Sequence, residues 1–205
     1  MTDSAEGRHP VNGDAAAARS WIEQSTLPDE DKAGLRRFVD HFPSLTFVRE
    51  DNAALSHYEE TDEVTLPPWF RETRSALAFT VPGAQVRVDG FRWDDSPRSD
   101  DQEDHWYEVE PGYVNEENRE TMFDLARLYP IGQWFANDRS YLAVDLEDVS
   151  NRRILEFALE DLWDDEAKGE PLRESTFPAY SSYADFLGHV VAVKLPDGTL
   201  VEAQD

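Results

Sequence analysis

The sequence of 205 residues contains no cysteine, so disulfide bonds, thiolate metal sites and cysteine nucleophiles are excluded. It also has no uninterrupted apolar stretch that approaches the roughly 20 residues of a membrane-spanning helix. The opening residues, MTDSAEGRHPVNGD, lack the basic start and the apolar centre of a secretory signal. We therefore expect a cytoplasmic protein that does not act at a membrane.

Basic residues are scarce as well. The chain has 19 Lys and Arg against 44 Asp and Glu, which gives a formal net charge of -25. Because phosphate contacts need Lys and Arg, this balance argues against a nucleic-acid partner. The same charge would attract a basic protein and speed its docking. A merely solvated or salt-adapted surface explains the charge equally well, and composition leaves both explanations open.

The signatures of common catalytic sites are also missing. No serine lies in a Gly-x-Ser-x-Gly elbow, and there is no glycine-rich phosphate loop. No two histidines are spaced i, i+4, and none fits a known metal signature; they are His9, His41, His57, His105 and His189. We expect no catalytic residue, metal or cofactor. One enzymatic alternative stays open, a carboxylate-dependent hydrolase using Glu108 and Glu110 on one strand face, or Asp164 and Asp165.

Helices are predicted in the first part of the chain. The expected caps Asp14 and Asp51 and several prolines give their starts, and apolar residues at i, i+3, i+4 and i+7 give their buried faces. Ser182 is the expected cap of a later helix. The expected helices run over Ala15–Gln24, from Pro28 to Pro43, after Asp51, and from Leu66-Pro67-Pro68 to Leu77. A short strand is expected around Phe47.

After Leu77 the hydrophobic period changes to two, which indicates strands joined by tight turns. The stretch Tyr129–Leu146, with its turn at Asn137-Asp138-Arg139, is the predicted central hairpin. Further strands are expected near residues 77–81, 86–88, 91–93, 105–110 and 154–159. Two more helices are expected, over residues 115–128 and from Ser182 to Val190. Residues 160–168 are expected to form an acidic loop, and the chain around Pro171 and Pro178 is expected to be irregular. The order predicts an α+β fold, mostly antiparallel sheet flanked by helices.

This pattern divides the chain into four parts. Residues 1–13 are expected to be a disordered leader and residues 14–49 an N-terminal helical extension. Residues 50–192 form the predicted α+β domain, and residues 193–205 form a tail with a turn at Pro196-Asp197-Gly198. A hydrophobic content of 40% is sufficient for the core of one such domain.

The motif order within residues 50–192 resembles the SUKH superfamily of cell-wall assembly regulators and bacterial toxin-immunity proteins. The resemblance rests on Leu66-Pro67-Pro68-Trp69-Phe70, Tyr129-Pro130-Ile131-Gly132, Tyr141–Leu146, the strand at Ile154–Leu159, and the helix at Tyr183–Leu187 preceded by Ser181-Ser182. Family members often have glycines in the turn after Pro-Ile-Gly, whereas residues 133–139 contain none. The resemblance implies a non-enzymatic SUKH-like domain that binds another protein, commonly a toxin and frequently a nuclease.

Two acidic segments with tryptophans are the candidate partner-binding sites. Residues 94–104 carry six acids between Trp93 and Trp106, and aromatic residues beside acids favour recognition of a basic partner. The alternative is a solvated loop whose tryptophans lie in the core. The second segment, residues 160–166, is alternatively a calcium loop or a solvated turn. The predicted partner-binding residues are Trp93, Asp94, Asp95, Asp100, Asp101, Glu103, Asp104, Trp106, Trp134, Trp163, Asp164 and Asp165.

These observations favour a bacterial immunity or antitoxin protein that neutralises a basic toxin domain by direct binding. A regulatory or scaffold module without a toxin partner is the alternative within the binding class, and the hydrolase is the alternative from the enzyme class.

Overall fold

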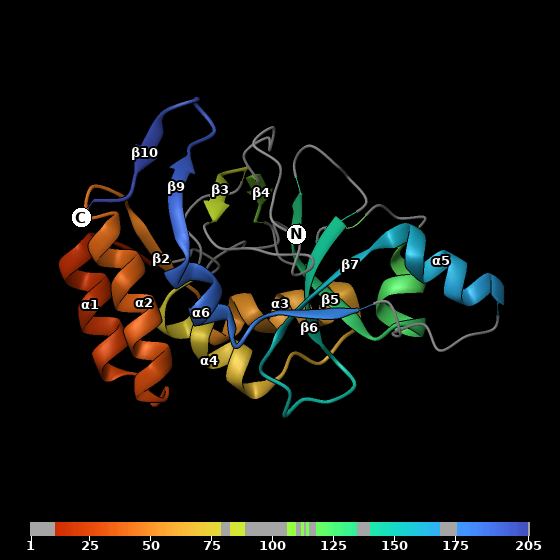
Figure 1. The fold of residues 1–205 in the computed structure, drawn as a ribbon. Helices are drawn as coiled ribbons and strands as arrows, with labels where there is room; N and C mark the ends of the chain where they lie inside the picture. The colour runs from red at the N-terminus through yellow and green to blue at the C-terminus, as the bar shows by residue number, and fades with distance from the viewer. Residues whose placement is uncertain are drawn as a thin grey trace, which may run out of the picture.

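The computed structural model describes residues 11–78, 83–88, 106–109, 112, 114, 118–134, 140–168 and 176–204. Its helices lie beside an eight-stranded antiparallel sheet, and a separate two-stranded sheet lies near the N-terminal helices (Figure 1). The predicted α+β class with a mostly antiparallel sheet is confirmed. No helix among the described residues is long and apolar enough to cross a membrane.

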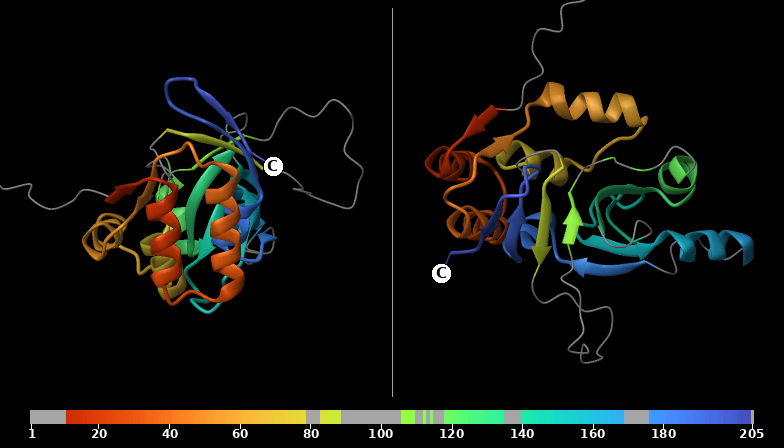
Figure 2. Two further views of the ribbon diagram at one scale, coloured as in Figure 1. Left: turned by 90° about the vertical axis from the view of Figure 1, so that its left-hand side faces the viewer. Right: turned by 90° about the horizontal axis from the view of Figure 1, so that it is seen from above.

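The two N-terminal helices form as their capping signals predict. α1 (Ala15–Gln24) begins after Asp14, whose side chain accepts a hydrogen bond of 2.9 Å from the amide of Ala17. α2 (Asp29–His41) begins after Pro28, with acids in its first turn near the positive end of the helix dipole. They pack side by side at one end of the molecule (Figure 2, left).

The predicted disordered leader is wrong for its last three residues. β1 (Val11–Gly13) pairs antiparallel with β2 (Phe47–Arg49), and residues 1–10 lie outside the described residues. The leader prediction missed β1 because these small polar residues carry no strand periodicity, and the pairing is with a distant segment.

The segment from residue 51 to residue 77 is the predicted pair of helices. α3 (Asn52–Asp62) is capped by the Asp51 side chain, which accepts from the amide of Ala54 at 2.9 Å. α4 (Pro68–Ala76) starts at the second proline of the Leu-Pro-Pro motif, where the missing amide hydrogen costs nothing.

The eight-stranded sheet has the order β10-β9-β3-β4-β5-β6-β7-β8. The predicted central strand pair is confirmed as β5 and β6, with Leu128 opposite Asp145 and a register shift between Pro130 and Gly132. Its predicted turn at Asn137-Asp138-Arg139 lies outside the described residues. The strands are β3 (Gln85–Val88), β4 (Trp106–Glu108), β5 (Leu128–Trp134), β6 (Ser140–Asp145), β7 (Ile154–Ala158), β8 (Phe177–Tyr180), β9 (Val190–Lys194) and β10 (Leu200–Glu202). Of the strand expected over residues 77–81, Leu77 and Ala78 are described, and Ala78 forms an isolated antiparallel bridge with Val48. Residues 79–81 and the strand expected at 91–93 lie outside the described residues.

The structure corrects four elements in the second half of the chain. The expected acidic loop is instead helix α5 (Leu159–Lys168), and the predicted helix over 115–128 contains a π-helix, η2 (Glu120–Leu125). The chain around Pro178 forms the edge strand β8, a position where proline is tolerated. α6 (Tyr183–Gly188) begins at the predicted Ser182 cap but ends before Val190, which starts β9.

The expected tail is also part of the sheet, because β9 and β10 form a hairpin around the predicted turn. The hydrophobic core runs across the boundary predicted between residues 49 and 50. α2 and α6 approach backbone to backbone, and a Cβ atom at Gly34 would lie 2.5 Å from the carbonyl oxygen of Ala184. The helical extension therefore contributes to the same core as the sheet.

Candidate protein-binding surface and buried polar clusters

The structure places only part of the predicted binding set. Trp93, Asp94, Asp95, Asp100, Asp101, Glu103 and Asp104 lie outside the described residues. Trp106 lies in β4 and is half-buried, with the Arg87 guanidinium 5.9 Å from its ring centroid. Trp134 is the last residue of β5, and Trp163, Asp164 and Asp165 lie on α5.

α5 has one apolar face and is acidic elsewhere. Leu159 and Leu162, at i and i+3, are 2% and 0% exposed and attach the helix to the core. Glu160 and Asp161 occupy the first turn, where carboxylates favour the helix dipole. Trp163 is 40% exposed. Two sequence signals indicate this helix, the Leu-x-x-Leu spacing and the acidic first turn. Sequence analysis assigned the segment to a loop because its many acids are typical of a solvated loop.

α5 lies at the opposite end of the molecule from α1 and α2 (Figure 1). It continues directly from β7 and extends past the end of the sheet (Figure 1; Figure 2, right). Residues 160–166, expected as a solvated turn with a calcium loop as the alternative, lie in this helix instead. In the part of the chain that the structure describes, no group of three or more His, Asp or Glu is placed to hold a metal ion.

Most arginines of the described residues are already engaged by acids of the fold. The ion-paired arginines are Arg19, Arg36, Arg71, Arg74, Arg87, Arg119 and Arg152. Their charges are therefore balanced within the molecule, and the surplus of carboxylates determines what an approaching partner meets.

A buried ion pair that sequence patterns did not predict joins Glu50, the residue after β2, to Arg74 of α4. Arg74 Nε donates to Glu50 Oε2 at 2.6 Å, and the two side chains are 4% and 7% exposed. The Tyr58 hydroxyl donates to Glu50 at 3.1 Å, and Arg74 Nη1 donates to the Tyr183 hydroxyl at 3.4 Å. Burial opposes the charge on Arg74, but Glu50 outweighs burial and raises the pKa of the guanidinium. Burial raises the pKa of Tyr183 to about 12.

A second buried cluster centres on Asp62, the last residue of α3. Its carboxylate accepts from the Tyr129 hydroxyl at 3.1 Å and from Arg119 at 3.0 Å. Burial, followed by the charge of Asp62, raises the pKa of Tyr129 well above its ordinary value. Phe123 of the π-helix stacks on Tyr129 at 5.8 Å. Gly112 has φ +75° and approaches so closely that a Cβ atom would lie 2.6 Å from Asp62.

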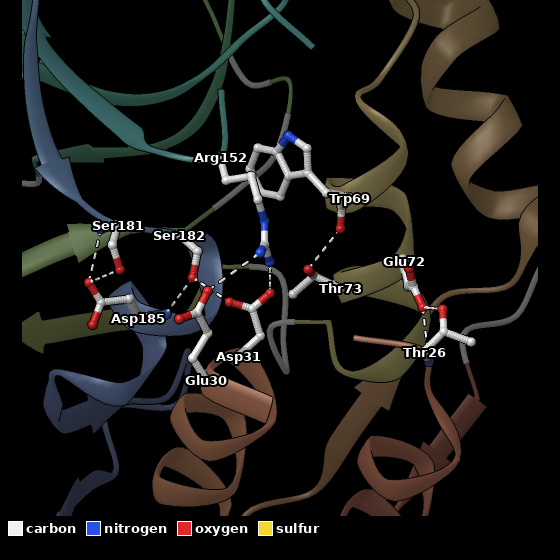
Figure 3. Close-up of polar contacts among 10 residues, drawn as sticks. All are labelled: Thr26, Glu30, Asp31, Trp69, Glu72, Thr73, Arg152, Ser181, Ser182 and Asp185. Carbon is white, nitrogen blue, oxygen red and sulfur yellow. Dashed lines mark hydrogen bonds and ion pairs between the residues drawn. The ribbon is translucent and has the colours of Figure 1, made fainter. Parts of the chain in front are cut away.

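A third cluster ties the connection between β6 and β7 to the helices. Asp145 is 2% exposed and accepts from the amides of Glu147 and Asp148 at 2.9 and 3.0 Å. The connection also contains Arg152, which forms an ion pair with Asp31 of α2 (Figure 3). Ser182, the cap of α6, donates to the same Asp31 at 2.9 Å. Asp145, the acid at the end of the apolar run of β6, therefore holds the backbone of the β6–β7 connection through its hydrogen bonds.

The structure describes only part of the residue set of the alternative hydrolase. Glu108 lies in β4 and is half-buried, Glu110 is outside the described residues, and Asp164 and Asp165 lie on α5. Of the histidines, His41 lies in α2, His57 in α3, and His189 follows α6, while His9 and His105 are outside the described residues.

No protein-family model, no curated protein and no solved structure matches this chain. The resemblance to the SUKH superfamily therefore stays an expectation drawn from motif order.

Proposed function

We propose that this chain is a protein-binding domain that acts as an immunity protein, neutralising a basic toxin domain by direct contact. The observation that carries the proposal is the net charge of -25, combined with arginines that are paired within the fold. Such a surface attracts a basic partner and accelerates its encounter. The SUKH-like motif order points to the same kind of partner.

Trp106 and Trp134 of the predicted set lie in strands, and α5 carries the rest of the predicted interface that the structure describes. Trp163 is exposed beside Glu160 and Asp161, and tryptophan is enriched among residues that dominate binding energy. Carboxylates around such an anchor would occupy the positions that phosphates take in the cleft of a nuclease. Binding in that cleft would keep the nucleic-acid substrate of the toxin out, so inhibition needs no catalytic group of this chain.

The experiment starts from the gene adjacent to this one, expressed alone and together with this chain. We expect the neighbouring product to be basic, to arrest growth when expressed alone, and to lose toxicity on co-expression. The purified pair should associate directly, and the association rate should fall as salt rises because steering is screened. A neighbour whose toxicity persists despite full expression of this chain contradicts the proposal.

A matched pair of variants locates the interface. Trp163→Ala should weaken binding by about 2 kcal/mol, a factor of about 30, if α5 supplies an anchor. Leu200→Ala removes a more exposed apolar side chain, 52% exposed, from β10 at the far edge of the sheet, and should leave affinity unchanged. Equal affinities for both variants would remove α5 from the interface.

A further inference from the structure

α3 is attached to the molecule differently from the neighbouring helices. Of its eleven residues only Leu55 and Asp62 are buried, so a single fully buried apolar side chain secures it. α2, by contrast, buries Leu35, Phe38 and Val39 against the core. Burial of apolar surface is the main term that keeps a helix docked, and α3 has little of it.

Polar contacts supply the other attachments of α3. The Tyr58 hydroxyl donates to Glu50, and the Asp62 carboxylate accepts from the Tyr129 hydroxyl. Glu59 accepts from the backbone amide of Leu66 at 3.0 Å and pairs with Arg71. Each of these groups finds a water partner when the helix detaches, so each hydrogen bond opposes opening only weakly.

The C-terminal end of α3 has the features of a hinge. Glu63 follows the helix with φ 55°, a left-handed conformation that is uncommon for a residue other than glycine, asparagine or aspartate. Val64, Leu66 and Pro67 are buried and fix the chain again before α4. The left-handed residue Glu63 therefore joins the helix directly to an anchored segment.

We propose that α3 is a lid that opens independently of the rest of the fold and uncovers the polar groups beneath it. Opening would separate Tyr58 from Glu50 and Asp62 from Tyr129, so that water reaches the Glu50–Arg74 pair and the Tyr129 hydroxyl. A ligand or partner that binds the uncovered groups would shift the population toward the open form. This device is independent of the proposed function, because it involves no residue of α5.

Hydrogen exchange on the full chain, followed by mass spectrometry across a urea series, tests the lid. Amides of residues 52–62 should exchange at least tenfold faster than those of α2 and β6, with little dependence on urea at low concentration. The weak urea dependence distinguishes local opening from global unfolding, which exposes far more surface. If α3 exchanges at the same rate and with the same urea dependence as β6, it opens only with the whole molecule and the lid is excluded.

Variants then test the attachments. Tyr58→Phe and, separately, Asp62→Asn should each raise the exchange rate of α3 about fivefold to tenfold, the effect of losing about one net hydrogen bond. Exchange of β6 should not change in either. Glu60→Gln, at an exposed site of the same helix, is the matched control and should leave α3 exchange unaltered. Equal acceleration of α3 and β6 would contradict the proposal, because the contacts would then stabilise the fold as a whole.

Discussion

The two halves of the eight-stranded sheet are buried in different ways. In β6 all six residues are buried, so both faces of this strand are covered. In β3 the burial alternates, with Val86 and Val88 inside and Gln85 and Arg87 partly exposed. The covered strand has an almost continuous apolar sequence, whereas the half-open strand has the period-two pattern typical of a sheet with one solvated face. One sheet therefore carries two sequence signatures.

The contrast between buried and half-open environments should be largest for ion pairs. The buried pair, Glu50 with Arg74 of α4, lies outside the eight-stranded sheet, directly after β2. Glu50→Ala leaves Arg74 buried without its carboxylate and should lower the free energy of unfolding by about 3–5 kcal/mol. Glu202→Ala removes the partner of Arg87 on the half-open side, where the carboxylate is 57% exposed, and should cost less than about 1 kcal/mol. Urea unfolding of both variants measures the difference. Similar losses of unfolding free energy in the two variants would mean that the Glu50–Arg74 and Arg87–Glu202 pairs are equally exposed to water.

Leucine truncations should repeat the contrast with apolar side chains. Leu142→Ala in β6 empties a fully buried site and should cost about 3 kcal/mol through lost burial and a residual cavity. Leu200→Ala in β10 removes a side chain that is 52% exposed and should change stability by no more than about 0.5 kcal/mol. Thermal and urea denaturation give both values. A large loss for Leu200→Ala would show that β10 is covered in solution.

The sequence predicted the features of the fold that depend on neighbouring residues along the chain. Asp14, Asp51 and Ser182 were recognised as caps, and β5 and β6 as a hairpin, because caps, turns and periodicity depend on neighbouring residues. α5 was missed because its acids resemble those of a solvated loop. β10 was missed because a three-residue edge strand is defined by its partner, β9.

The candidate site was less predictable than the fold for the same physical reason. Trp163 was identified as a binding residue from composition, but its exposure depends on how α5 docks through Leu159 and Leu162. The Glu50–Arg74 pair joins residues 24 positions apart, and the Asp62–Tyr129 contact joins residues 67 positions apart. No local pattern indicates such contacts, since they exist only when the tertiary packing brings the elements together.

The buried tyrosines make the covered region sensitive to alkali. Burial raises the pKa of Tyr183 to about 12, above the value of about 10 in an unfolded chain. The neutral form is favoured in the fold, so its contribution is fully present below pH 10 and is lost as pH rises toward 12. The loss should amount to about 2–3 kcal/mol.

Stability measured against pH, with tyrosinate absorbance recorded in parallel, checks this prediction. Tyr183→Phe should flatten the decline between pH 10 and 12, because it removes the titrating group while keeping the ring. If stability declines as steeply in Tyr183→Phe, the alkaline sensitivity comes from other groups. Tyr129 would then be the next residue to replace.

Two glycines give the smallest and most diagnostic contrast. Gly34→Ala should destabilise by about 2 kcal/mol, although alanine normally favours a helix, because the new Cβ would lie 2.5 Å from the carbonyl oxygen of Ala184. Gly198→Ala should cost about 1 kcal/mol for another reason, because nothing lies within 4 Å of the new Cβ but the backbone φ is +85°.

Asparagine variants distinguish steric overlap from backbone strain, because asparagine tolerates the left-handed backbone but is larger than alanine. Gly198→Asn should recover most of the loss, whereas Gly34→Asn should be worse than Gly34→Ala, as unfolding midpoints will show. Recovery at both positions would mean that α2 and α6 do not pack as closely in solution as the backbone distance requires.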